Sequence, residues 1–147
     1  MQLGEKSAGE DYRGIELAGP TRYAPAMPDN STCRWIYHLS RRADWDLAKT
    51  AGSYRGSYED TADGFLHFST AGQVVGSAAK HRSGESGLVL LEVDSVALGE
   101  ALRWEPARGG ELFPHLYGPL PASAVAAEFD LPLNKDGLHV FPAMKME

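Results

Sequence analysis

The chain has 147 residues, a hydrophobic content of 43% and a net charge of −6, a balance that favours one folded domain with an apolar core. An acidic chain lacks the basic surface that nucleic-acid binding needs, so we expect no nucleic-acid partner. No apolar run approaches the ~18–20 residues of a membrane span, so we also expect no membrane partner. Cys33 is a single cysteine and the N-terminus lacks the apolar stretch of a signal peptide, so we expect a cytoplasmic protein without disulfides.

The chain divides into an arm and one domain. Residues 1–32 carry Gly, Pro, Ser, Asp and Glu with a few isolated apolar residues, a composition that cannot offset the entropy of ordering. We therefore predict a disordered N-terminal arm over 1–32 and a single α+β domain over 33–147.

The first half of the domain contains both predicted helices. Residues 34–39 are aromatic and β-branched, which indicates a strand. Trp45, Ala48 and Ala51 recur at helical spacing and predict a helix over 43–51, which Gly52 ends. Thr70 and Gln73 have the spacing of a capping box. The order is then a polar loop at 53–63, a strand at 64–69 and a helix at 71–81.

The second half is predicted to be almost entirely extended. Residues 88–93 are nearly all apolar, as in a strand covered on both faces. The proline within 112–117 favours an edge strand or a strand-like loop. We further predict strands at 101–105, 126–133 and 138–141. Two main helices among about six strands, without regular alternation, indicate an α+β fold with a small mixed or mostly antiparallel sheet.

Three histidines lie on predicted strands between apolar neighbours. Because side chains alternate across a strand, His38 shares a face with Ile36, His67 with Phe65 and Ser69, and His115 with Phe113 and Tyr117. Apolar walls with a few polar groups are typical of a ligand pocket. Three histidines could also hold a catalytic zinc, but the spacing does not specify a metal and we assign no metal ligand.

Two further segments could bind an anion. Glu105 ends a strand beside a glycine-rich turn that contains Arg108, whose guanidinium would suit a phosphate. Ser69 and Thr70 precede a helix, so they could offer hydroxyls and helix-start amides to an anion as well as cap the helix.

A series of motifs resembles family 952 of the domains of unknown function, a family of small bacterial proteins. The motifs arrive in order and cover nearly all of residues 33–142: IYHL at 36–39, GSY at 52–54, DGFLHFST at 63–70, LLEVD at 90–94, LRWE at 102–105 and FPHLYGPL at 113–120. The family has been viewed as a remote relative of ADP-ribosyltransferases, and the opening strand, helix and glycine resemble theirs. This resemblance implies an ADP-ribosyltransferase-like split sheet.

The resemblance also implies roles for individual residues. His38 would hold NAD, and His67 with Ser69 would line the nicotinamide pocket. Glu105 and His115 both compete for the late polar position that orients the reacting groups. Tyr37 and Tyr117 could stack on the nicotinamide or the adenine ring. The expected cofactor is therefore NAD, and the expected partner is a small molecule or nucleotide.

The resulting hypothesis is an NAD-dependent ADP-ribosyl transfer enzyme with catalytic residues His38, His67, Glu105 and His115. Its cofactor-binding set is His38, Tyr37, Ser69, Thr70, Arg108 and Tyr117. The ribosyl centre would become oxocarbenium-like, and a carboxylate could stabilise that charge or deprotonate the acceptor. Two alternatives remain open at this point: a non-catalytic nucleotide or small-metabolite binder, and a zinc-dependent hydrolase on three histidines.

Overall fold

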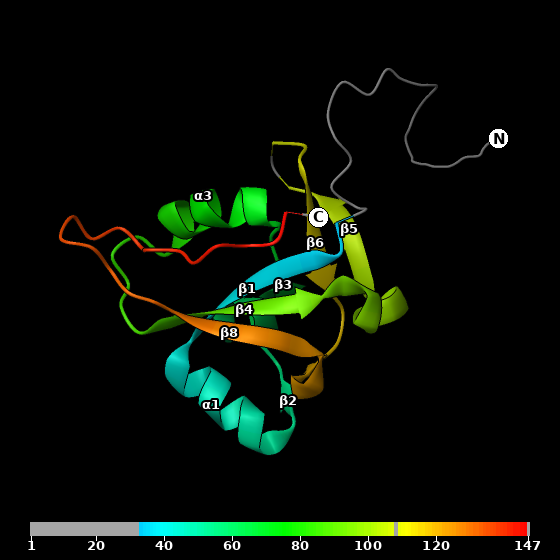
Figure 1. Cartoon of the computed structure of the whole chain (residues 1–147). Coiled ribbons are helices and arrows are strands. Elements are labelled where there is room, and N and C mark those ends of the chain that lie inside the picture. The colour runs from blue at the N-terminus through cyan, green and yellow to red at the C-terminus, as the bar shows by residue number, and fades with distance from the viewer. Residues whose placement is uncertain (1–32, 108, 147) are drawn as a thin grey trace.

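The computed structural model describes residues 33–107 and 109–146 (Figure 1). The predicted arm at 1–32 and the predicted phosphate ligand Arg108 lie outside this range. The fold is α+β, as predicted, and its described strand ladders are antiparallel. No helix in the described part of the chain has the length and apolar character needed to cross a membrane.

The central sheet has three strands in the order β1-β4-β8. Its middle strand contains the apolar run that the sequence singled out, and six of its seven residues are buried, as expected for a strand covered on both faces. Pro132 follows the last strand and cannot donate to a ladder, so this strand ends before the predicted residue 133. The bounds are β1 (Trp35–Arg41), β4 (Leu88–Asp94) and β8 (Val125–Leu131).

A second sheet has the order β3-β6-β5, so the prediction that 112–117 is an edge strand is wrong; β3 pairs only with His115 and Leu116, which leaves Pro114 beside β5 alone in the ladder. A small third sheet pairs β2 with β7. The predicted strand at 64–69 is shorter than expected, because only two of its residues pair with β6 while Ser69 bridges to Tyr37 of β1. This bridge ties the second sheet to the central one. The bounds are β2 (Ser53–Tyr54), β3 (Leu66–His67), β5 (Leu102–Pro106), β6 (Leu112–Leu116) and β7 (Leu120–Pro121), with 3-10 helices η2 (Ser95–Ala101) and η3 (Ala122–Ala124) between strands.

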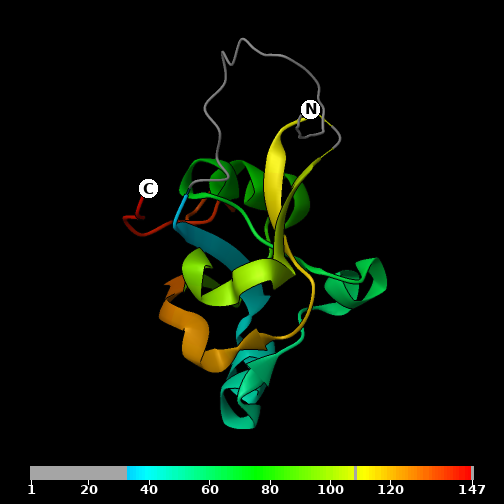
Figure 2. The ribbon, with the colours of Figure 1, turned by 90° about the vertical axis from the view of Figure 1, so that its right-hand side faces the viewer.

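The two predicted helices cover opposite faces of the central sheet. Helix α1 (Arg42–Ala51) buries Trp45 and Ala48 against the face of Ile36 and Val89, and this core continues to the second sheet. Helix α3 (Ala71–His81) packs Val74 on the other face. Figure 2 shows the β5–β6 hairpin beside α3, at the end of the molecule away from α1.

A third helix, α2 (Tyr58–Asp63), lies in the segment predicted to be a polar loop. It has six residues and no apolar periodicity, so hydrophobic patterning could not reveal it. The helix is held by its first turn, where the Ser57 amide and hydroxyl both donate to the Asp60 carboxylate at 2.8 and 2.9 Å. Asp60 is thereby fixed in a buried position.

The C-terminal segment runs back between α3 and β1 (Figure 1). The predicted strand at 138–141 is reduced to one bridge between His139 and Leu133, with backbone hydrogen bonds from Val140 to Pro132 and from Asn134 to Leu138. Lys145 anchors its end, because its amide donates to the Tyr37 hydroxyl at 2.9 Å and its ammonium lies 3.8 Å from the Trp35 ring centroid. The same ammonium lies 3.5 Å from the buried Glu92 carboxylate.

Candidate functional site

A cleft of about 550 Å³ lies between β1, α2, β3, α3 and β6. Five of the residues that the sequence predicted line it: Tyr37, His38, His67, Ser69 and His115. Its volume falls within the range of about 300–1,000 Å³ that is usual for small-molecule sites. The strands therefore bring all three predicted histidines to one place.

His38 is buried and fully hydrogen-bonded within the protein. Its Nδ1–H donates to the His67 carbonyl oxygen at 2.6 Å, and its Nε2 accepts from the Tyr54 hydroxyl at 2.9 Å. Burial lowers the pKa of His38, and the nearby Asp60 carboxylate opposes this only in part. The ring is thus neutral, and it ties β1 to β3 and β2.

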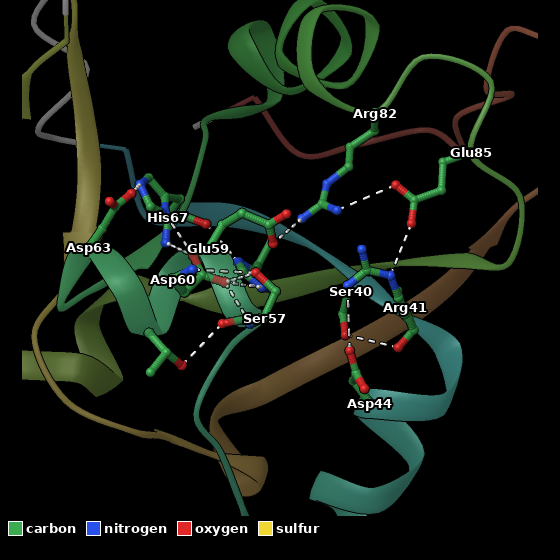
Figure 3. Close-up of polar contacts among 12 residues, drawn as sticks. Ser40, Arg41, Asp44, Ser57, Glu59, Asp60, Asp63, His67, Arg82 and Glu85 are labelled. Atoms are coloured by element: carbon green, nitrogen blue, oxygen red, sulfur yellow. Dashed lines mark hydrogen bonds and ion pairs between the residues drawn. The ribbon is translucent and has the colours of Figure 1, made fainter.

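Asp60 is the centre of the polar network in Figure 3. Its Oδ2 accepts the two Ser57 bonds, while its Oδ1 accepts from the His67 amide at 3.0 Å and from His67 Nδ1 at 2.6 Å. Burial pushes the pKa of Asp60 upward, but the hydrogen bonds from the His67 ring and from the Ser57 and His67 amides outweigh it and lower the pKa. The carboxylate therefore stays ionised although it is buried.

His67 lies between two aspartates. Its Nδ1 faces Asp60, and its Nε2 lies 3.0 Å from the Asp63 carboxylate (Figure 3). The hydrogen bond to Asp60 raises the pKa of His67, with burial opposing and Asp63 reinforcing the effect. The half-exposed ring is therefore held as a cation whose two N–H groups are both occupied.

His115 is the cross-strand partner of His67 in the β3–β6 ladder, and the two ring centroids lie 5.6 Å apart. Its Nδ1–H donates to Glu105 Oε1 at 2.8 Å, and the Tyr117 hydroxyl donates to the same oxygen at 2.7 Å. Burial would raise the pKa of Glu105, but these two donors lower it. Within the described residues His115 Nε2 has no hydrogen-bond partner, so this atom carries a lone pair that can accept a proton.

Glu105 and His115, which competed for one role at the sequence level, thus form a single hydrogen-bonded pair. His115 lines the cleft, and Glu105 lies behind it and orients its ring. Phe65 stacks on His115 with centroids 4.2 Å apart and also contacts the rings of His67 and Tyr117. An aromatic cluster therefore surrounds the two histidines on the outer face of the β3-β6-β5 sheet.

The remaining predicted ligand residues have different positions. Tyr37 borders the cleft, but its ring is wholly buried and its hydroxyl donates to Glu92 at 2.8 Å, so it offers no stacking surface. Ser69 pairs with Tyr37 through its backbone, and its side chain is buried beside the cleft. Thr70 caps α3, where its amide donates to the Gln73 side chain at 3.0 Å.

Several cleft residues were not predicted from the sequence. Asp60, Asp63 and Glu59 come from α2, and Arg82 comes from the end of α3. The available signal was Ser57 followed three residues later by Asp60, a spacing that is typical of a capped helix start. Recognising that helix would have placed its carboxylates together near His67.

The three-histidine zinc site is not supported. In the part of the chain that the structure describes, no three His, Cys, Asp or Glu side chains are arranged to hold a metal ion. Both ring nitrogens of His38 are bonded inside the protein, and those of His67 face carboxylates. A zinc ion would need three nitrogens about 2 Å from one point.

Comparison with known proteins gives a family without a stated activity. The family model "Protein of unknown function (DUF952)" matches residues 39–128. The crystal structure of protein CC0527 from Caulobacter crescentus is 49% identical, covers 72% of this chain and 93% of its own, and gives a TM-score of 0.70. The solution NMR structure of CC0527 is 50% identical, covers 71% and 90%, and gives a TM-score of 0.65.

No curated protein gives a significant match. The family match nevertheless spans more than half of the chain, and it includes α2, β3 and β6, whereas His38 lies one residue before its start. The similarity to CC0527 extends over nearly the whole of that protein. The chain belongs to the DUF952 family.

Proposed function

We propose that this protein binds a nucleotide in the cleft, with NAD as the first candidate, and transfers its ADP-ribosyl group to an acceptor. The observation that carries the proposal is the pair of opposed histidines, each with its own carboxylate. His67 is held as a cation by Asp60, whereas His115 is oriented by Glu105 with Nε2 available. Two imidazoles at one cleft, one with both ring nitrogens facing carboxylates and one with Nε2 available, are suited to acid–base chemistry.

His115 would act as the general base. In the transfer, the bond between the ribosyl carbon and nicotinamide breaks with its electron pair going to nicotinamide, which leaves as a neutral molecule. The acceptor heteroatom forms the new bond to that carbon and gives its proton to His115 Nε2. Glu105 supports this step because its carboxylate stabilises the imidazolium that results, as in other carboxylate–histidine pairs.

The carboxylates of α2 would stabilise the positive charge that develops during the transfer. Asp60 and Asp63 line the cleft, and positive charge develops at the ribosyl carbon as nicotinamide leaves. Carboxylates fixed in place before the reaction stabilise such charge without reorganising. Phe113, which is partly buried on another wall, provides apolar surface for a planar ring.

His38 would be a positioning residue in this scheme. Its hydrogen bonds to the His67 carbonyl and the Tyr54 hydroxyl hold β3 beside β1, and its ring is too buried to take part in proton transfer. Replacing His38 with alanine would therefore disturb His67 and the fold together, so it is a poor test of direct NAD contact.

The test is titration calorimetry with NAD and ADP-ribose, combined with an assay for nicotinamide release. His115→Asn should keep NAD affinity within about threefold and slow release by about 100-fold, the usual worth of a general base. The control His139→Asn changes a histidine that binds the Glu85 carbonyl and does not line the cleft, and it should leave both readouts unchanged.

Absence of NAD binding to the wild-type protein would refute the proposal. If NAD binds but no nicotinamide is released, either with or without added acceptors, the result would favour the non-catalytic binder instead. Release that is insensitive to His115→Asn would remove the general-base assignment while leaving the substrate assignment in place.

A further inference from the structure

Arg82 is a cation in the cleft that the acid–base chemistry does not use. It follows the last residue of α3, lines the cleft, and leaves only 16% of its side chain exposed. A guanidinium has five N–H donors in a fixed plane and stays charged, so a largely buried one requires oxygen partners.

The two carboxylates beside Arg82 lie at different distances from its guanidinium. Nη1 lies 3.3 Å from Glu85, a carboxylate that also binds Arg41 at 3.2 Å. Nη2 lies 3.9 Å from Glu59, which is beyond hydrogen-bond range, and the Glu59 side chain is 59% exposed. Figure 3 shows this chain of contacts from α2 through Arg82 to the segment after α3. The Nη2 side of the guanidinium is therefore weakly satisfied where it faces the cleft.

An anionic ligand group could replace Glu59 at small cost. An exposed ion pair contributes little to stability, and Glu59 would regain full hydration on leaving. A phosphate would instead form short, paired hydrogen bonds with the guanidinium, which are about twice as strong as neutral ones. Because one negative charge leaves as another arrives, the charge balance around Arg82 and Glu85 is preserved.

We propose that Arg82 is the anchor for the phosphate groups of the bound nucleotide, and that Glu59 holds its place until the ligand arrives. This inference rests on the proposed function for the identity of the nucleotide, but the phosphate subsite itself is a separate property of the cleft. It would set the ligand class, because a nucleoside without phosphate lacks the group that Arg82 binds.

The experiment measures binding of NAD, nicotinamide riboside and inorganic pyrophosphate by titration calorimetry. Arg82→Gln should weaken NAD and pyrophosphate about tenfold or more and leave nicotinamide riboside unchanged, since one charged hydrogen-bonding group is lost. Glu59→Gln should tighten NAD by about two- to fivefold because a competitor is removed. The matched control Arg41→Gln removes another partner of Glu85 that does not line the cleft, and it should change binding less than twofold.

The outcomes separate the two proposals. A folded Arg82→Gln protein that binds NAD as the wild type does would overturn the anchor and leave the proposed function intact. Pyrophosphate binding that depends on Arg82, without NAD binding, would uphold the anchor and overturn the proposed function. Failure of the wild type to bind either ligand would overturn both. If Arg82→Gln does not fold, Glu59→Gln decides, and unchanged NAD affinity in that variant would count against the anchor.

Discussion

Replacing Asp60 with asparagine should destabilise the protein by about 3 kcal/mol. The two side chains have nearly the same shape, so the change leaves packing intact and removes charge and one acceptor. Asp60 accepts four hydrogen bonds, two from Ser57 and two from His67. An asparagine has one oxygen, so its NH₂ group must face either the two Ser57 donors or the two His67 donors. The less costly orientation faces Ser57, and it leaves the Ser57 amide without an acceptor, which costs about 1–3 kcal/mol. The lost charge weakens the bond to the His67 cation, which brings the total near the lower end of the 3–5 kcal/mol for breaking a buried pair.

Urea unfolding followed by the fluorescence of the buried Trp45 measures this loss. Asp63→Asn is the matched control, because Asp63 binds the other nitrogen of the same histidine at 3.0 Å but is 52% exposed. Such an exposed partner should contribute less than about 1 kcal/mol. A loss below about 1 kcal/mol for Asp60→Asn, or equal losses for the two variants, would refute the account of Asp60 as the centre of the network.

Two other predictions concern the backbone and the pH profile. Gly56→Ala should lower the free energy of unfolding in urea by about 2–4 kcal/mol, because Gly56 has a φ of 89° and an added Cβ would lie 2.4 Å from the Leu66 side chain. The control Gly52→Ala, at a φ of 92° with open space around it, should lower it by only about 1 kcal/mol. In an NMR titration, His67 should show a raised pKa and His38 a lowered one. The His67 contribution to stability is then complete below its unfolded pKa of about 6.5 and is lost as the pH rises through the higher folded value, whereas the His38 contribution is lost as the pH falls below about 6.5. A lower pKa for His67 than for His38 would contradict this assignment.

The longer elements could be predicted because each has a periodic apolar face. The strand over Leu88–Asp94 and the helices α1 and α3 bury the residues that the pattern indicated. The two-residue strands β2 and β7 carry no such period, and α2 is polar on most of its surface. The strands β2 and β7 depend on the tertiary contacts around them, which local sequence does not encode, whereas α2 is held by its own Ser57–Asp60 cap, a signal that apolar periodicity does not detect.

The candidate site was predictable in part for the same reason. Strand alternation placed His67 and His115 among aromatic residues, and the structure brings the two rings together. It could not show that Glu105 binds His115, because that contact depends on the β5–β6 register, in which Glu105 opposes Phe113. Nor could it show that the ring nitrogens of His38 are bonded internally, since Tyr54 reaches it from another sheet.

The contact between Trp35 and Lys145 brings the two ends of the described part of the chain close together. Because the first strand and the final residues meet at one spot, a peptide joining them would span a short gap and cost little closure entropy. A circular permutant, with new ends opened in an exposed turn such as that around Gly84, is therefore a practical form of this protein. For the same reason, a mechanical pull applied at Trp35 and Met146 would load the Trp35–Lys145 contact first, and would peel the C-terminal segment from the central sheet before any force reached the cleft.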